Sequence, residues 1–369
     1  MIKYDVIVDY NKIDEVYRKI CGKTKHKTKL VNFELSKFTN FVNIYTKLKN
    51  KEYCHGKYNI FLIKIPKHRI IMSECLDDKI VNHLVSLYIL FPLIEPHLLD
   101  INVATRKDKG LEKGFLYIKK VFNLIRNDFD DYYALKCDVN KYFYSIDHDI
   151  LFEKLGKIIT DKDIITLLRN IIDSTNSPYV NQGIEKLVNS EINSIEKLDC
   201  DKRSKQKQID KLKKIPLYKK GKGLPIGNMT SQLLAIFYLN DLDHFIKEKL
   251  HIKYYMRYMD DFILFHKDKE YLKYCEKAIS EELDKLKLTL NEKTGIIKLS
   301  NGLTFLGYRF INKNKRTYIL MNKTMRKKIR KRYKKDGEII LKKYNGYLKR
   351  CVSKKYKNNL LLSKKGWHQ

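Results

Sequence analysis

The sequence predicts an α+β chain in which helical stretches are interrupted by antiparallel hairpins. Three pairs of β-prone runs lead to this expectation. Residues 60–72 hold two short apolar runs broken by Pro66, which favours a hairpin over a single strand. Residues 253–266 have the pattern of strand, tight turn and strand, and residues 303–310 and 316–321 look like a further hairpin.

The composition points to a polyanionic partner. The 369 residues include 76 Lys and Arg against 43 Asp and Glu, which gives a formal net charge of +33. With 43% hydrophobic residues the chain is too apolar for a disordered polycation. An enzyme of small metabolites has no need of such an excess, so we expect nucleic acid or an anionic membrane surface as partner.

Three other classes are disfavoured. The most apolar stretch, Val81–Leu99, is interrupted by polar residues and prolines, which argues against a spanning helix. Residues 1–11 lack an apolar core of signal-peptide length. The seven cysteines are scattered, odd in number and never form a C-x-x-C pair, which argues against a zinc site or a disulfide framework. We therefore expect a cytoplasmic protein.

The remaining elements are predicted in chain order. Residues 1–57 are expected to form an N-terminal helical extension, and residues 78–99 a helix that ends near Pro92. The compact apolar run Ala134–Val139 contains a carboxylate and predicts a buried strand. Residues 186–222 are rich in Lys and show little periodicity, so this insertion is expected to be a solvated loop or a helix pair. Further helices are expected over 149–173, 231–250 and 271–288, and from about 322 onward.

The carboxylates are the most informative residues. Asp260 and Asp261 lie at the tip of the hairpin predicted for 253–266, between apolar and aromatic arms. A buried carboxylate without a partner costs several kcal/mol, and the usual remedy is a bound cation. Asp138 ends the strand at 134–139, and carboxylates from two strands can share Mg²⁺. The alternatives are an acidic surface turn for Asp260 and Asp261 and a structural role for Asp138.

Four motifs stand out along the chain, namely Asp138–Asp147, Gly223–Gln232, Tyr258–Asp261 and Phe305–Phe310. They resemble the motifs of reverse transcriptases, in the same order and with similar spacing. The resemblance covers about residues 60–350 and implies a right-hand polymerase fold. It implies a fingers/palm domain with an antiparallel palm sheet over 58–310, interrupted by the insertion 186–222, and a basic helical thumb over 311–369. The segment 1–57 remains unmatched.

The resemblance implies an RNA-directed DNA polymerase, which adds deoxynucleotides to a primer 3′-end. Asp138 and Asp260 match the two principal metal ligands, Asp261 an auxiliary ligand, and the Val139 carbonyl a backbone ligand. The implied cofactor is two Mg²⁺ ions, for which Mn²⁺ can substitute. Two metal ions about 4 Å apart would activate the 3′-hydroxyl and stabilise the leaving pyrophosphate.

Several residues match positions that face the incoming nucleotide. Lys67 and Arg69 match fingertip cations that hold the triphosphate. Phe143 matches a steric gate that leaves no room for a 2′-hydroxyl, and Lys293 a Lys proposed to protonate pyrophosphate. The alternatives are exposed hairpin charges, a core Phe and a solvated Lys. The nucleotide-facing motif also contributes Ile226, Gly227 and Gln232.

The motif around Ile226 narrows the resemblance. Most reverse transcriptases have Gln-Gly-x-x-x-Ser-Pro there, whereas this chain has Ile226-Gly-x-x-x-Ser-Gln232, similar to the enzymes of bacterial diversity-generating retroelements. Loss of the Gln amide is consistent with relaxed fidelity; the alternative is that Ile226 packs in the core. Reverse transcriptases of phage-defence systems share parts of the pattern, so a role in diversification and a role in phage defence both stay open. The segment 102–110 resembles a basic family segment, with Asp108 where Gly is common.

The basic surface matches nucleic acid better than membrane. Met325–Lys335 holds eight Lys and Arg in eleven residues, around most of a helix rather than opposite one apolar face. The expected partners are an RNA template, a DNA or RNA primer, dNTPs, a structured noncoding RNA, and an accessory protein or a second copy. Template-independent or protein-primed synthesis stays open, whereas the intact acids disfavour a non-catalytic, maturase-like RNA-binding protein. The expected nucleic-acid contacts are Arg106, Lys109, Leu306, Gly307, Arg326, Lys327, Arg330 and Lys331.

Overall fold

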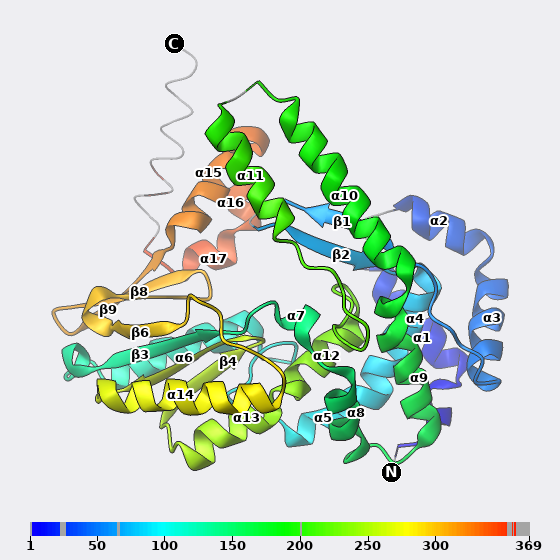
Figure 1. The fold of residues 1–369 in the computed structure, drawn as a ribbon, viewed down its shortest axis with the longest axis horizontal. Helices are drawn as coiled ribbons and strands as arrows, with labels where there is room; N and C mark the ends of the chain where they lie inside the picture. The colour runs from blue at the N-terminus through cyan, green and yellow to red at the C-terminus, as the bar shows by residue number, and fades with distance from the viewer. Residues whose placement is uncertain are drawn as a thin grey trace. The chain divides into compact units, whose positions relative to one another are not determined.

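The structure, a computed structural model, describes residues 2–22, 27–64, 67–199, 201–352, 356 and 358. The chain divides into two compact units, each assembled from three segments (Figure 1). Unit 1 comprises Met1–Leu99, Val139–Leu242 and Glu282–Thr289, and unit 2 comprises Asp100–Asp138, Asp243–Glu281 and Leu290–Gln369. No helix among the described residues is both long enough and apolar enough to cross a membrane.

Unit 1 begins with three helices, α1 (Tyr10–Cys21), α2 (Lys27–Leu35) and α3 (Lys37–Lys49). The Asp9 carboxylate caps α1 by accepting hydrogen bonds from the backbone N–H groups of Asn11 and Lys12, at 2.8 and 3.3 Å. The inward face of α1 carries apolar residues three and four positions apart, as expected of an amphipathic helix.

The predicted hairpin at 60–72 is confirmed. β1 (Asn59–Ile63) and β2 (Arg69–Ser73) form a two-stranded antiparallel sheet, and Pro66 lies outside the described residues. The helix predicted to end near Pro92 is confirmed: α4 (Leu76–Val85) runs through a π-helical turn, 86–90, into α5 (Phe91–Ile94), which ends two residues past Pro92. Pro92 lies in the first turn of α5, which directly continues the π-helical turn.

The Lys-rich insertion is a helix pair, one of the two structures predicted for it. α10 (Pro178–Glu196) begins before the predicted insertion, and α11 (Lys202–Lys213) is capped by the Asp201 carboxylate, which accepts from the Ser204 N–H at 2.8 Å. The other helices of these segments are α7 (Tyr142–Ser145), α8 (His148–Gly156), α9 (Lys162–Ile172), α12 (Met229–Tyr238) and α13 (Asn240–His244).

Unit 2 is built on a four-stranded antiparallel sheet with strand order β4-β5-β3-β6. Its core lies where Phe122 and Phe265 meet edge to face, with ring centroids 6.4 Å apart. Both strands predicted for residues 253–266 and the strand predicted at 134–139 are present. The elements are α6 (Gly110–Leu124), β3 (Tyr133–Asp138), β4 (Tyr254–Tyr258), β5 (Asp261–His266), α14 (Lys269–Lys285) and β6 (Gly295–Lys298).

A three-stranded antiparallel sheet follows, where a single hairpin was expected. The extra strand arises because Leu306 and Gly307 both have positive φ, 49° and 84°, and make a tight two-residue turn within the segment 303–310. The strands are β7 (Leu303–Phe305), β8 (Tyr308–Lys313) and β9 (Arg316–Met321), followed by α15 (Lys323–Asp336), α16 (Ile339–Lys343) and α17 (Asn345–Lys349).

Candidate active site

The turn between β4 and β5 carries two of the three predicted acids. Tyr258 pairs with Asp261, so Met259 and Asp260 form a two-residue turn. Met259 has a φ of 58°, a conformation that residues with a Cβ rarely adopt. Such backbone strain persists only where the surrounding structure enforces it, and it is concentrated at functional sites.

The third acid lies on the neighbouring strand. Asp138 is directly opposite Asp261 in the β3–β5 register. Cβ atoms of directly opposed residues lie about 4.5–5.5 Å apart, and like charges at that separation destabilise a sheet. Unit 2 thus brings together the carboxylates of Asp138, Asp260 and Asp261 from two strands far apart in the sequence.

The Asp261 carboxyl is poorly compensated by protein groups. Burial raises its pKa to about 7, with Asp138 and Asp260 raising it further and Lys136 lowering it. The Lys136 ammonium lies 3.6 Å from Asp261 Oδ1, and that oxygen is buried without a hydrogen-bond partner in the described part of the chain. A buried carboxylate oxygen in this state fits a site for a cation.

Within the described ranges, no three His, Cys, Asp or Glu side chains form a ready-made metal cage. The donor set nevertheless suits Mg²⁺, which is commonly bound by one or two carboxylates together with substrate phosphates and water. Val139, the predicted backbone ligand, directly follows Asp138 and is buried. The residues present therefore fit Mg²⁺ that arrives with a nucleotide.

A buried ion pair that the sequence analysis missed supports the turn. The Arg257 guanidinium and the Asp243 carboxylate, both fully buried, make two hydrogen bonds of 2.7 and 2.5 Å. Arg257 Nη1 also donates to the Met259 carbonyl at 2.9 Å, so this pair holds the strained residue of the turn. A lone Arg in an otherwise apolar strand was the available signal, since a buried charge requires a partner.

The segment that carries Lys293 lies against the first acid. The Asn291 N–H donates to the Asp138 carbonyl at 2.7 Å, and the Asp138 N–H donates to Thr294 Oγ1 at 3.4 Å. The Lys293 side chain between them is exposed. Lys293 thus belongs to the same unit as the three acids and to a segment in contact with one of them.

Phe143 and the 223–232 motif meet within unit 1. The Leu224 N–H donates to the Phe143 carbonyl at 2.7 Å, and the Phe143 ring is half-buried. His148, which the sequence analysis did not single out, fixes the same turn through contacts of 2.8 Å with the Gly223 carbonyl and 2.9 Å with Asp173.

The same motif is joined to the β1–β2 hairpin. The Met72 N–H donates to the Ile226 carbonyl at 2.9 Å. Gly227 has a φ of 146°, and a Cβ there would lie 2.3 Å from the Met72 carbonyl oxygen, so only Gly fits. The half-buried Ile226 and the exposed Gln232, Lys67 and Arg69 all belong to unit 1, together with Phe143.

The turn at Leu306 and Gly307 is held by its surroundings in unit 2. A Cβ on Gly114 of α6 would lie 2.8 Å from Leu306 Cδ1, so α6 approaches the turn closely. The Gly307 carbonyl accepts hydrogen bonds from the Tyr347 hydroxyl and, at 3.3 Å, from the Asn322 N–H.

The basic segment before α6 is ordered by its own contacts. Arg106 donates to the Asn102 carbonyl at 2.9 Å, and the Lys109 ammonium pairs with Asp100 at 2.9 Å. Asp108 has a φ of 58°, which explains why Gly suits this position in the family pattern. Asp is among the residues that tolerate the left-handed conformation best.

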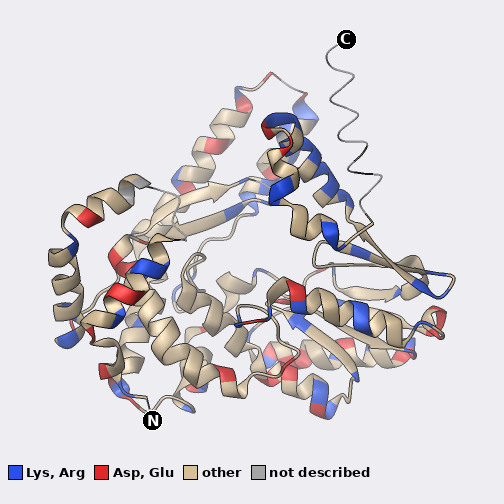
Figure 2. Cartoon of the chain, turned by 180° about the vertical axis from the view of Figure 1, so that it is seen from behind, with Lys and Arg blue, Asp and Glu red and all other residues tan. Residues whose placement is uncertain are grey.

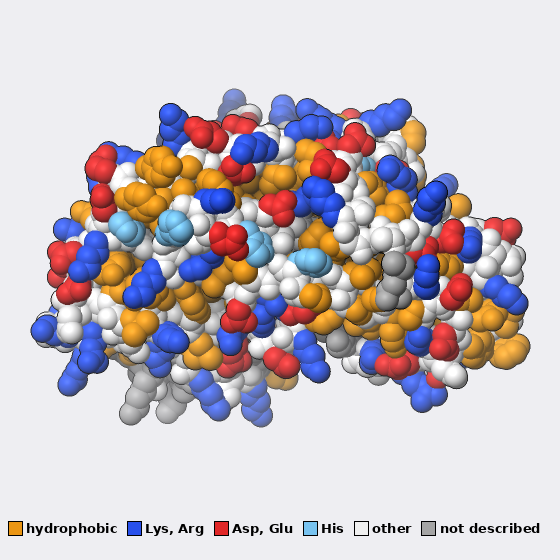
Figure 3. Space-filling view, turned by 90° about the horizontal axis from the view of Figure 1, so that it is seen from below, with side chains coloured by type: hydrophobic (Ala, Val, Ile, Leu, Met, Phe, Trp, Pro, Cys, Tyr) orange, Lys and Arg blue, Asp and Glu red, His pale blue; other side chains and the backbone are white. Residues whose placement is uncertain are grey.

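Most of α15 consists of Lys and Arg (Figure 2), whereas its Ile329 and Tyr333 are buried in a hydrophobic cluster. Elsewhere the charges are mixed: on the face shown in Figure 3, Lys and Arg are interspersed with acidic and hydrophobic side chains. The predicted contacts on α15 are all exposed, namely Arg326, Lys327, Arg330 and Lys331.

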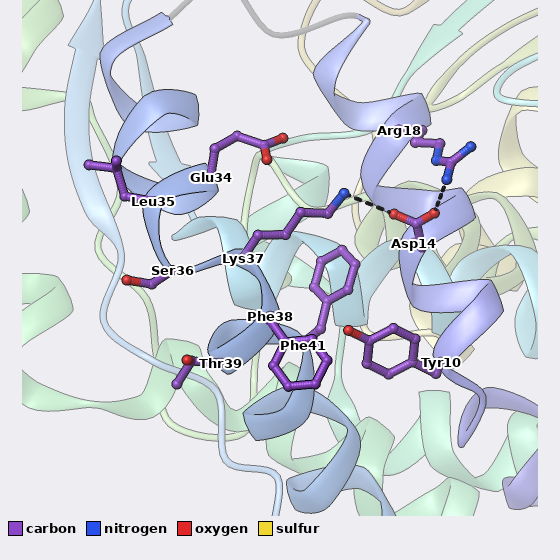
Figure 4. A pocket seen from close by; sticks show the side chains of 10 residues that line it. All are labelled: Tyr10, Asp14, Arg18, Glu34, Leu35, Ser36, Lys37, Phe38, Thr39 and Phe41. Carbon is purple, nitrogen blue, oxygen red and sulfur yellow. Dashed lines mark ion pairs between the residues drawn. The ribbon is translucent and has the colours of Figure 1, made fainter.

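A surface cavity of about 580 Å³ lies among α1, α2 and α3 of unit 1 (Figure 4). Asp14 at its edge pairs with Lys37 at 3.2 Å and with Arg18 at 2.5 Å. Leu35 and Phe38, both largely exposed, form part of its lining. None of the predicted site residues contributes to this cavity.

Comparison with known proteins identifies the family. Residues 57–310 match the family described as reverse transcriptase (RNA-dependent DNA polymerase). No curated protein matches the chain.

Among solved structures, telomerase from Candida albicans in complex with a fragment of telomeric RNA is 13% identical over 77% of this chain and 51% of that chain, with a TM-score of 0.46. Apo telomerase from Candida tropicalis, truncated from its C-terminal domain, is 16% identical over 76% of this chain and 60% of that one, with a TM-score of 0.46. A further apo telomerase structure from Candida tropicalis is 16% identical over 72% and 48% of the two chains, with a TM-score of 0.40.

The chain therefore spans about half to three fifths of the length of these telomerase chains. The family match covers more than half of the 369 residues. The observed α+β fold with antiparallel sheets agrees with the right-hand polymerase fold that the motifs implied. The chain belongs to the reverse transcriptase (RNA-dependent DNA polymerase) family.

Proposed function

We propose that this chain is an RNA-directed DNA polymerase that adds deoxynucleotides to a primer 3′-end. The observation that carries the proposal is the pairing of Asp138 with Asp261 across β3 and β5, with Asp260 in the adjoining turn. A buried carboxylate oxygen without a hydrogen-bond partner, among three acids, favours a bound cation. The family match supplies the reaction class.

Asp138 and Asp260 would hold the metal ions, with Asp261 and the Val139 carbonyl as further ligands. Bound Mg²⁺ would activate the primer 3′-hydroxyl and offset the charge that develops on the leaving pyrophosphate. The protein's own contribution is positioning: the Arg257–Asp243 pair fixes the turn that carries Asp260.

The residues that match nucleotide-facing positions of the family are proposed to contact the incoming nucleotide. Lys67 and Arg69 would bind the triphosphate, and Lys293 would donate a proton to pyrophosphate. The Phe143 ring would exclude a 2′-hydroxyl, so that deoxynucleotides are preferred. Arg106, Lys109 and the cations of α15 would contact the backbones of template and primer.

We further propose a bacterial retroelement origin and a structured noncoding RNA as partner. Support comes from the Ile226-Gly-x-x-x-Ser-Gln232 pattern and from the net charge of +33. Sequencing the RNA that copurifies with the chain tests this: one enriched, folded species would support it, whereas bulk cellular RNA would contradict it.

The catalytic assignment is tested by primer extension on an RNA template with the wild type, Asp260→Ala and Asp284→Ala. Asp284 is an exposed acid of α14 and serves as the matched control. We expect Mg²⁺-dependent incorporation by the wild type and by Asp284→Ala, and a loss of at least about 10³-fold in Asp260→Ala. Equal incorporation by all three proteins would contradict the assignment.

A further inference from the structure

We propose that the helix pair α10–α11 braces the β1–β2 hairpin and thereby positions Arg69 for the triphosphate of the incoming nucleotide. The inference rests on the proposed function and assigns a role to the Lys-rich insertion. All the elements concerned belong to unit 1, and α10 and α11 lie beside β1 and β2 in Figure 1.

The hairpin needs such a support because it consists of two strands only. Isolated two-stranded hairpins are marginally stable in water, and packing against a helix is one way to stabilise them. The side chains of β2 alternate: Ile70 and Met72 are buried, whereas Arg69 is exposed. Because neighbouring strand residues point to opposite faces, Arg69 lies on the face away from the buried one.

The buried face of the hairpin packs against α10. Val180 and Ile184 of α10 are buried in one cluster with Ile70 and Met72 of β2. Ile60 of β1 packs against the same cluster. A Cβ on Gly183 of α10 would lie 3.1 Å from Ile60 Cδ1. The absence of a side chain at position 183 therefore lets the helix approach the strand closely.

α11 extends this support from the second helix of the pair. Ile209 and Leu212 of α11 are buried against Ile195 of α10. Leu62 of β1 and Val188 of α10 contact both this cluster and the cluster between α10 and β2. One continuous apolar contact thus runs from α11 through α10 to β1, while the cations of α11 remain on its outer side.

Polar contacts fix both ends of β1 to α10. The Tyr58 N–H donates to the Tyr179 hydroxyl at 3.0 Å at the start of the strand. The Lys64 ammonium pairs with Glu191 at 2.6 Å just after its end. The hairpin is therefore held along its whole first strand, and its second strand carries Arg69.

The test introduces a bulky side chain, the wedge, at the close contact between α10 and β1. The substitution is Gly183→Leu, which should push α10 away from β1. Gly156→Leu is the matched control, because Gly156 ends α8 with open space where a Cβ would be. Ile60→Ala in the Gly183→Leu background should restore the fit, since it returns the volume that the wedge occupies. Glu191→Lys, with Lys64→Glu as its rescue, is a milder second pair.

Two measurements are made on each full-length protein. Hydrogen exchange at residues 59–63 and 69–73 reports hairpin order without any need for activity. Single-nucleotide incorporation at saturating template–primer gives the KM for dNTP and kcat. In Gly183→Leu we expect exchange at least about tenfold faster and a KM about tenfold higher, with kcat changed less than about threefold. Glu191→Lys should raise KM by no more than about fivefold.

The proposal is overturned if folded Gly183→Leu leaves exchange and KM unchanged, or if Ile60→Ala does not restore them. It is also overturned if the affinity for template–primer falls by the same factor as that for dNTP, because the effect would then not be specific to the nucleotide. Absence of incorporation by the wild type would instead refute the proposed function, while the exchange data still decide whether α10 and α11 brace the hairpin.

Discussion

Asp261→Asn should stabilise the protein when no divalent metal is present. The Asp261 pKa is about 7, against 3.8 for an ordinary Asp. The difference corresponds to about 4 kcal/mol at 1.36 kcal/mol per pKa unit. The side chain is 32% exposed, so solvent screening reduces the expected effect to about 2 kcal/mol.

The direction in which stability changes with pH follows from the raised pKa of the Asp261 carboxyl group. Between pH 4 and 7 the unfolded chain releases the proton of Asp261 while the folded chain retains it, so stability falls as pH rises. Above about pH 7 the folded chain carries the full penalty. An amide cannot ionise, so Asp261→Asn removes this pH dependence.

The assay is urea unfolding in EDTA at pH 5 and pH 8, with Asp284→Asn as an exposed control. Part of the effect has already developed at pH 5, so we expect the wild type to be less stable at pH 8 than at pH 5 by about 1 kcal/mol, and Asp261→Asn to lose that difference. Added Mg²⁺ should stabilise the wild type more than the variant. A variant that is less stable than the wild type in EDTA at pH 8 would refute the reasoning.

Three further outcomes are expected. Phe143→Ala should raise ribonucleotide incorporation about 10- to 100-fold relative to dNTP, and an unchanged ratio in competition assays would remove the gate. Arg257→Ala should cost about 3–5 kcal/mol in urea unfolding, because Asp243 would remain buried without a partner; a loss below 1 kcal/mol would show that the pair is not structural. Replacing Arg330 and Lys331 together by Gln should reduce the salt dependence of template–primer affinity by about two counterions, measured by anisotropy across salt concentrations, whereas an unchanged slope would remove both contacts.

The local sequence pattern was sufficient to predict the strands of the larger sheet and the position of the acidic residues on them. The apolar and aromatic arms of residues 253–266 and the apolar run before Asp138 predicted strands β3, β4 and β5 where they are found. The placement of Asp260 in the hairpin turn and of Asp261 beside it followed from the same pattern, because two apolar arms must fold back on each other around a polar pair.

Contacts between distant segments could not be read from the sequence. Nothing in the local pattern pairs Arg257 with Asp243 or joins Met72 to Ile226. The helix end near Pro92 was predicted, whereas the π-helical turn at 86–90, which joins α4 to α5 just before it, had no signal in the sequence. Aliphatic residues in the Lys-rich insertion were too sparse to show that it packs on anything.

The hydrogen bond between Met72 and Ile226 runs from main chain to main chain. This link between the hairpin and the nucleotide-facing motif therefore does not depend on which side chain stands at position 226. Gly227, in contrast, cannot be replaced, because a Cβ there would clash with the Met72 carbonyl. Residue 226 can therefore be replaced without breaking this hydrogen bond. A library at position 226 should keep the hairpin joined to the motif, and the error rates of its members test whether residue 226 influences copying accuracy.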